Sequence, residues 1–228
     1  MALYELIIRD FNGSTVELGK LNTTLDNIRN LIVKHWDELR HEAHVKETLG
    51  MRHFVFSTNI KINVVLNEKL PRERALPLLA GLGISDLHIG SLISTSTPDL
   101  KLISSILYVV GSLANSRSIT VYFQPSAVQR SNGELSICYH LALRPFSDVK
   151  KLIVNESAVK QVLSGNIPDE LRSWLINLLQ KGRLDSRFKK QLRIIYYMVG
   201  GFITRDSIFT WFMGDGVLGH VGRGSFDI

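Results

Sequence analysis

Residues 53–66 read HFVFSTNIKINVVL, and apolar side chains alternate with polar ones along most of this stretch. One face would carry Phe54, Phe56, Ile60, Ile62, Val64 and Leu66, and the other Ser57, Asn59, Lys61 and Asn63. A period of two is typical of a half-buried antiparallel strand. We therefore expect one long strand over residues 54–66, with one face on a hydrophobic core.

Two helices are expected between this strand and Gly111. The first follows Leu70-Pro71, because proline suits the first turn of a helix, and it would turn leucines 76, 79 and 82 inward. Pro77 is expected to limit this helix. The second should run from about Pro98 to Leu113, with Thr97 as its cap and the buried stripe Leu100, Ile103, Leu107 and Val110.

The first fifty residues predict a hairpin followed by a helix. Asn12-Gly13 suits a tight turn between strands at Leu3–Ile8 and Thr15–Leu18. A helix capped at Thr23 would then run to about Thr48 and stop near Gly50. We expect residues 1–50 to be a separate module or a part of the main fold, and residues 51–228 to be the core domain.

The remaining chain adds strands and helices in turn. The expected elements are a hairpin of Ile119–Phe123 and Leu135–Leu143 around Asn132-Gly133, helices at Ser157–Leu163 and Pro168–Lys181, and a buried strand at Gln191–Val199. From Gly200 onward the tail alternates glycines with aromatic residues. The predicted class is α+β, an antiparallel sheet packed against several helices, with an N-terminal hairpin plus helix.

Composition limits the classes of protein that fit. The 228 residues are 45% hydrophobic and 21% charged, values of an ordinary globular protein. Cys138 is the single cysteine, so neither an intramolecular disulfide nor a cysteine-based zinc site can form, and a reducing compartment such as the cytosol is expected. We expect no signal peptide, and no apolar run reaches the roughly 18 residues that a membrane span needs.

Charge is unevenly distributed along the chain. The net charge is +6, but residues 1–50 carry 6 Lys and Arg against 8 Asp and Glu, whereas residues 151–228 carry 11 against 7. A basic body of this kind favours anionic partners, either phosphate backbones or acidic lipid headgroups.

Candidate catalytic motifs lack the context that their chemistry needs. Gly214–Gly219 matches GxGxxG, but only nine residues follow it, too few for a dinucleotide-binding unit. His41 and His44 are three residues apart, whereas the zinc protease motif needs four, so a solvated helix face is expected there. Cys138 and His140 lie on one strand face without a third orienting group. We therefore expect no catalytic residue, metal, cofactor or small-molecule substrate.

The strongest local signal is a basic stretch near the C-terminus. Six cations fall within thirteen residues: Lys181, Arg183, Arg187, Lys189, Lys190 and Arg193. They fit an acidic membrane, a nucleic acid backbone, or simply a solvated turn. Beyond them, a second apolar set could contact a membrane or another subunit, or form core: Phe209, Trp211, Phe212 and Met213.

Several segments resemble one known family. They are FVFSTNIKI (54–62), LLA (78–80), SDLHIG (85–90) and ILYVVG (106–111), and in order and character they resemble the early core of rhabdovirus matrix proteins. Those proteins commonly begin with a flexible lysine-rich arm that bears a proline-based budding motif. This chain instead begins with a slightly acidic segment and contains neither Pro-Pro-x-Tyr nor Pro-Thr-Ala-Pro.

The resemblance implies a structural role. A matrix protein of this family is expected to self-assemble, to bind the nucleoprotein–RNA complex and the inner face of an acidic membrane, and to drive virion assembly in the host cytoplasm. The alternative is a basic nucleic-acid-binding protein, such as a viral nucleocapsid protein or an RNA silencing suppressor, that uses residues 181–193.

Overall fold

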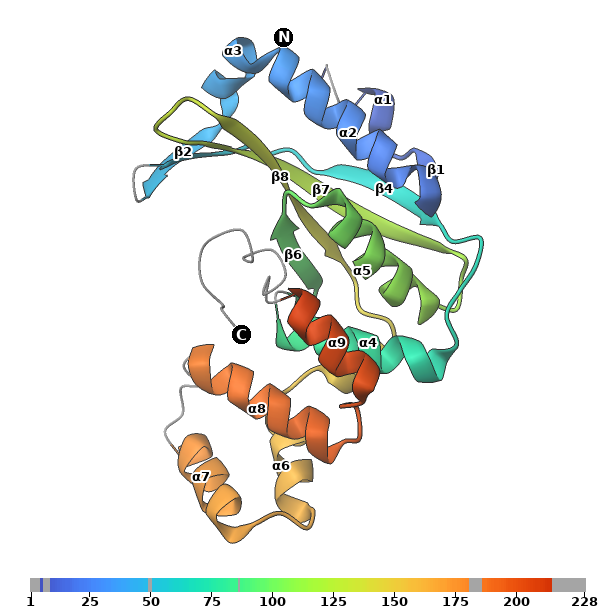
Figure 1. Cartoon of the computed structure of the whole chain (residues 1–228), viewed down its shortest axis with the longest axis vertical. Coiled ribbons are helices and arrows are strands. Elements are labelled where there is room, and N and C mark those ends of the chain that lie inside the picture. Colours follow the sequence, from blue (N-terminus) through green and yellow to red (C-terminus); the bar gives the residue numbers. More distant parts are fainter. Residues whose placement is uncertain (1–4, 6–8, 49–50, 86, 181–185, 215–228) are drawn as a thin grey trace, which may run out of the picture. The chain divides into compact units, whose positions relative to one another are not determined.

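The chain forms two compact units. The computed structural model describes residues 5, 9–48, 51–85, 87–180 and 186–214 (Figure 1). Unit 1 consists of residues 1–71 and 92–144, and unit 2 consists of residues 72–91 and 145–228. Helices and a mixed sheet confirm the predicted α+β class. The predicted division at residue 50 stays a prediction.

Unit 1 is built on a twisted sheet. Its strands run in the order β1-β4-β7-β8-β6, while β3 also pairs with β7, and β2 with β3. The pairing of β1 with β4 is parallel, and the other pairings of this unit are antiparallel. The bounds are β1 Thr15–Glu17, β2 His44–Thr48, β3 Met51–Val55, β4 Ile60–Val65, β6 Ile93–Thr97, β7 Ser118–Gln129 and β8 Leu135–Leu143.

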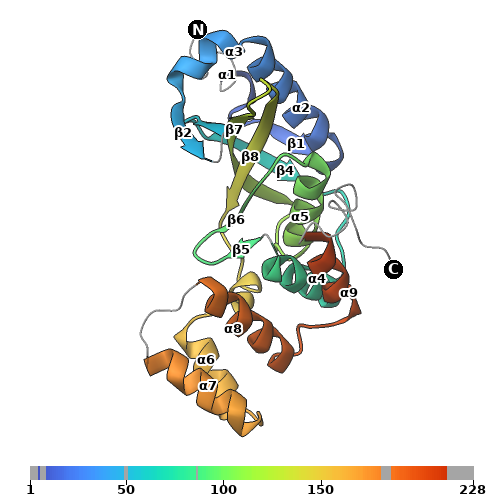
Figure 2. The ribbon, with the colours of Figure 1, turned by 60° about the vertical axis from the view of Figure 1, so that its left-hand side comes forward.

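Two helices of unit 1 pack on one face of this sheet. They are α2 (Leu18–Lys34) and α5 (Leu100–Ser112), as Figure 2 shows, and their buried side chains meet those of the strands. The hydroxyl of Tyr139 on β8 donates to the carbonyl of Leu25 on α2 at 2.6 Å. Three short helices complete the unit: α1 Arg9–Phe11, α3 Trp36–Leu39 and the 3-10 turn η2 Arg40–Glu42.

The predicted long strand is interrupted. Its alternation is confirmed, since Phe54, Phe56, Ile60, Ile62, Val64 and Leu66 are all buried. A single strand over 54–66 is nevertheless wrong, because residues 56–59 separate β3 from β4. Both strands pair with β7, and Val55 and Ile60 lie opposite Ser126 and Phe123. Between them β7 has Pro125, which has no N–H to donate, and the Gln124 side chain instead donates to the Phe56 carbonyl at 2.7 Å.

The predictions of an N-terminal hairpin and of a long helix after it are also wrong. Thr15–Glu17 is extended, but it pairs in parallel with β4, and Arg9–Phe11 is a helical turn. Residues 3, 4 and 6–8 of the first predicted strand lie outside the described residues. Thr23 is inside α2, which begins at Leu18 and ends at Lys34. Residues 44–48 form β2, because their alternate backbone groups pair with β3.

The next hairpin and the helix α5 lie where they were predicted, but the cap of α5 differs. The β7–β8 hairpin is confirmed, with Gly133 at a φ of 84° in its turn. The helix predicted from Pro98 is confirmed as α5, but Asp99 rather than Thr97 is its cap, because the Asp99 carboxylate accepts from the backbone N–H groups of Lys101 and Leu102. Thr97 ends the strand β6, which we did not predict.

Unit 2 is mainly helical. Its elements are α4 Arg72–Ile84, β5 His88–Ile89, η3 Val149–Leu152, α6 Glu156–Ser164, α7 Asp169–Gln180, α8 Ser186–Val199 and α9 Arg205–Gly214. The helices predicted at Ser157–Leu163 and Pro168–Lys181 are confirmed as α6 and α7. The strand predicted at Gln191–Val199 is wrong, because that segment belongs to α8 and buries Leu192, Tyr196 and Tyr197 at helical spacing.

Helices α4 and α9 pack closely within unit 2. Pro77 does not end α4, which continues to Ile84. The Thr210 hydroxyl on α9 donates to the Leu78 carbonyl on α4 at 2.9 Å. Gly81 permits this approach, since a Cβ at that position would lie 2.1 Å from the carbonyl oxygen of Ser207.

Candidate functional site

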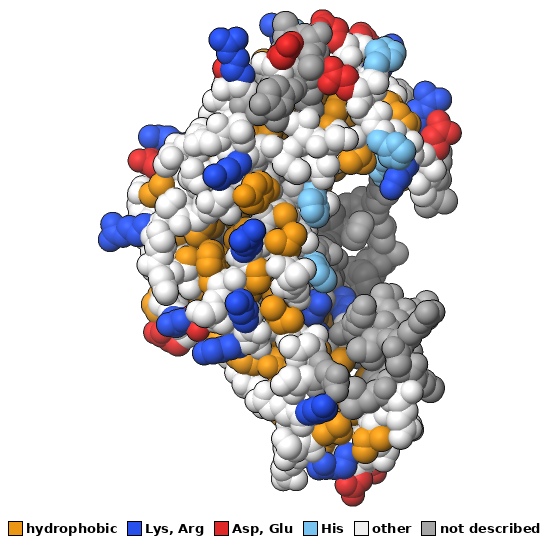
Figure 3. All heavy atoms as spheres, turned by 180° about the vertical axis from the view of Figure 1, so that it is seen from behind, with side chains coloured by type: hydrophobic (Ala, Val, Ile, Leu, Met, Phe, Trp, Pro, Cys, Tyr) orange, Lys and Arg blue, Asp and Glu red, His pale blue; other side chains and the backbone are white. Residues whose placement is uncertain are grey.

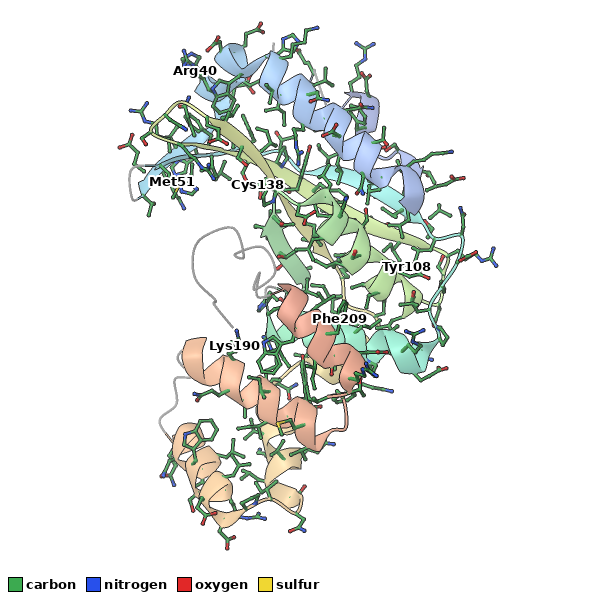
Figure 4. All side chains as sticks on the ribbon, viewed as in Figure 1. Arg40, Met51, Tyr108, Cys138, Lys190 and Phe209 are labelled. Atoms are coloured by element: carbon green, nitrogen blue, oxygen red, sulfur yellow. The ribbon has the colours of Figure 1, made fainter. Side chains whose placement is uncertain are left out.

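The predicted basic stretch is placed only in part. Lys181 and Arg183 lie outside the described residues, and Arg187 and Lys189 belong to α8 with side chains that are not described. Lys190 is exposed on α8 (Figure 4). The last four cations of the stretch, Arg187, Lys189, Lys190 and Arg193, therefore belong to the helix α8. We had expected a polar turn followed by a strand there.

Arg193 points toward the interior of unit 2. It is half-buried, and its guanidinium donates to the carbonyl of Gly83 at the end of α4. One turn further along α8, the Tyr197 hydroxyl donates to the Leu152 carbonyl at 2.8 Å. This face of α8 thus holds the unit together. Of the six predicted contact residues, Arg193 already has a structural role.

Phe209 is the more exposed of the two predicted apolar contacts whose side chains the structure describes. Its side chain is 61% exposed on α9, where Figure 4 labels it, whereas Trp211 is half-buried. Phe212 and Met213 also belong to α9, but their side chains are not described. Burying a phenyl ring that is exposed to water gains about 1.5–3 kcal/mol, so Phe209 is a candidate contact residue.

Three exposed apolar residues were missed from the sequence. Ile208 precedes Phe209 and is 43% exposed, and Met198 and Val199 at the end of α8 are 62% and 46% exposed. Our reading of residues 191–199 as a buried strand hid the last two. The helical spacing of Leu192, Tyr196 and Tyr197 could have revealed Met198, which lies off that buried stripe. The same spacing would not have revealed Val199, which lies seven residues after Leu192 and is exposed at the last position of α8.

The turn between α8 and α9 is built from aromatic rings. Phe202 packs against Tyr196 and Tyr197 with ring centroids 6.2 and 6.0 Å apart. Gly201 adopts a φ of 71°, a backbone conformation that favours glycine. These ring contacts fix the turn that joins the two helices. We call Met198, Val199, Ile208 and Phe209 the apolar set of unit 2.

A second surface is the side of the unit 1 sheet that faces away from α2 and α5. We call it the open face; its side chains alternate with the buried ones on β3, β4, β6, β7 and β8. Its members include His53, Val55, Lys61, Asn63, Ser94, Ser96, Thr120, Tyr122, Gln124, Ser126, Val128, Ser136, Cys138, His140 and Ala142. Tyr122 is 43% exposed, and a concavity of about 250 Å³ lies nearby, lined by Val55, Ser96, Gln124, Ser126 and His140.

Among the residues that the structure describes, the histidines lie on separate segments of the chain, and His140 is the one that follows Cys138 on β8. Burial raises the pKa of the Cys138 thiol, and Arg29 and Ser136 offset this only in part. His140 Nδ1 is 2.9 Å from the Ser96 hydroxyl, and His41 and His44 lie in η2 and β2 rather than on one helix face. Within the described ranges, no three His, Cys, Asp or Glu side chains could hold a metal ion. Apart from Gly214, the GxGxxG motif lies outside them.

None of the helices described is long and apolar enough to cross a bilayer. Scans against protein-family models, curated proteins and solved structures give no match for this chain.

Proposed function

We propose that the protein is a structural protein of matrix type. It self-assembles, binds a nucleoprotein–RNA complex, and attaches to the inner, acidic face of a membrane in the host cytoplasm, where it drives virion assembly. The observation that carries this proposal is the apolar set of unit 2, in which Phe209 is 61% and Met198 62% exposed on helices that also carry cations.

Charge and apolar contact would act together at a membrane. Unit 2 contains 14 Lys and Arg against 10 Asp and Glu. Each cation near an acidic leaflet contributes about 1 kcal/mol, and partial burial of the exposed Phe209 ring would add about 1–2 kcal/mol. A few such contacts give reversible attachment, which suits a protein that has to assemble and disassemble.

The same exposed residues fit contact between subunits. Apolar side chains that are open in one chain become buried when a second chain covers them, and their burial drives association. The sequence resemblance to rhabdovirus matrix proteins adds support, since its segments include the core strands β3 and β4 and helices α4 and α5.

Flotation and electron microscopy test this function together. The purified chain should float with vesicles that contain about 30% phosphatidylserine, should remain at the bottom with neutral vesicles, and should detach at about 1 M salt, where the Debye length is about 3 Å. Ordered assemblies should appear by negative-stain microscopy. A chain that neither assembles nor floats at low salt would contradict the proposal.

The alternative function, binding of nucleic acid through residues 181–193, depends on cations that act together. Arg193 is already engaged with the Gly83 carbonyl, which leaves at most five of the six for such a role. If the stretch acts mainly at a membrane, charge reversal at Lys189 and Lys190 should weaken flotation more than it weakens RNA binding. The opposite result would favour the alternative function.

A further inference from the structure

The open face of unit 1 has the properties of a surface that receives a flexible anionic polymer. Lys61 is exposed and lies directly opposite Tyr122 in the sheet. The strands of the open face contribute no Asp or Glu side chain to it. On the edge strand β1, Glu17 shares this side of the sheet, and it forms an ion pair with Lys20 at 3.2 Å.

Figure 3 views the molecule from behind, opposite the side on which α5 lies in Figure 1, and its Lys and Arg side chains stand among hydrophobic and neutral polar ones. On the open face itself, Lys61 is exposed and the five strands supply no Asp or Glu side chain. This balance of charge is complementary to a negatively charged partner.

The neutral side chains of the face suit the edges of nucleobases. Gln124, His140 and Ser96 lie side by side on β7, β8 and β6, because Gln124 pairs with His140 and His140 with Ser96. Since the Ser96 hydroxyl already meets His140 Nδ1, the Nε2 atom of that ring is the one left to meet a ligand. Amide, imidazole and hydroxyl groups supply both donors and acceptors. A base edge also presents both donors and acceptors, so it can pair with this mixture.

Tyr122 and the concavity are placed for two neighbouring bases. The concavity of about 250 Å³ is smaller than most sites for drug-sized ligands, and a single flat base matches its size. Tyr122 and Gln124 are two residues apart on one strand, hence about 7 Å apart. Bases of a single strand can leave their stack to meet an aromatic ring, whereas a base in a duplex must first be unpaired and unstacked.

We propose that the open face binds single-stranded RNA. Tyr122 stacks on one base, the concavity beside Gln124, His140 and Ser96 receives the next, and Lys61 contacts the backbone. This site belongs to unit 1, so it does not depend on membrane attachment through unit 2. A protein of matrix type would gain from it a direct contact with the RNA of a nucleoprotein complex.

The test measures the fluorescence anisotropy of a labelled oligouridylate as the full chain is added. An RNA of about 12 nucleotides is within the usual site sizes of single-strand binders. Tyr122→Ala should weaken binding about tenfold or more, and Tyr122→Phe, which keeps the ring, should bind like the wild type. Lys61→Glu should weaken binding and lower the slope of log affinity against log salt by about 1. The matched control is Lys101→Glu on the exposed side of α5, which should leave affinity nearly unchanged.

Three outcomes would overturn this site. They are absence of binding by the wild type at low salt, wild-type affinity in Tyr122→Ala, and equal competition by double-stranded RNA. Flotation separates this proposal from the function proposed above. Tyr122→Ala should float on acidic vesicles like the wild type, while Phe209→Glu should lose flotation and keep its affinity for RNA.

Discussion

Gly81→Ala should destabilise the chain, although alanine is the better helix former. Gly81 is buried in α4, and a Cβ there would lie 2.1 Å from both the Ser207 carbonyl oxygen and the Thr210 hydroxyl on α9. Ordinary contact needs about 3.5 Å. The Ser207 oxygen belongs to the backbone of α9, so it cannot rotate away as a side chain would, and α9 would have to move.

The expected size of the effect follows from three contributions. Replacing a helical glycine by alanine gains about 1 kcal/mol. Overpacking a tight contact costs about 1–3 kcal/mol, and movement of α9 would also lose the Thr210–Leu78 hydrogen bond, worth about 1 kcal/mol. We therefore expect a net loss of about 1–3 kcal/mol.

Urea unfolding provides the assay. Trp174 and Trp211 belong to unit 2 and Trp36 to unit 1, so circular dichroism should be recorded beside tryptophan fluorescence. The matched control is Gly19→Ala in α2, where a Cβ would meet nothing within 4 Å and the propensity gain of up to about 1 kcal/mol should appear as added stability. If Gly81→Ala were stabilised as Gly19→Ala is, the close packing of α4 and α9 would be refuted.

Three further predictions concern single side chains. Tyr139→Phe should cost about 1 kcal/mol at pH 7, because it removes the hydrogen bond from the Tyr139 hydroxyl to the Leu25 carbonyl of α2. Burial raises the pKa of Tyr139 and of Tyr197 above the ordinary value of about 10. The protonated phenols of Tyr139 and Tyr197 therefore add to the free energy of unfolding fully below about pH 10, and this contribution is lost as pH rises further. In urea titrations between about pH 8 and 11.5, the Tyr139→Phe variant should lose less stability than the wild type. Because burial raises the pKa of Cys138, its thiol should react slowly with Ellman's reagent at pH 8 in the native chain and fast in the urea-unfolded chain. Equal rates in the native and unfolded chains would contradict this prediction. Asp99→Ala should cost about 1 kcal/mol in thermal melts, and Thr97→Ala less, because Asp99 is the side chain that caps α5.

Periodicity predicted the core but not the chain path. The alternating apolar residues of β3, β4, β7 and β8 are buried as expected, because burial of one sheet face follows directly from a period of two. The interruption at residues 56–59 could not be seen in that pattern. It follows from the register with β7, a strand remote in sequence, in which residues 56–59 lie opposite only Gln124 and Pro125.

The sequence also identified only part of the candidate sites. Composition identified the basic stretch and Phe209 as surface candidates, and Phe209 is indeed exposed. The sequence could not show that Arg193 turns toward Gly83, since that hydrogen bond joins residues 110 positions apart. The open face was also missed, because Tyr122, His140 and Ser96 come together only through the pairing of three separate strands.

Vesicle binding by one pair of variants tests the proposed function most directly. Phe209 on α9 and Val33 on α2 are both exposed apolar residues, at 61% and 48%, and each can be replaced by glutamate. If unit 2 attaches the protein to acidic membranes, Phe209→Glu should bind phosphatidylserine vesicles at least about tenfold more weakly, which corresponds to about 1.4 kcal/mol, while Val33→Glu binds like the wild type. Equal binding by the two variants would contradict the account.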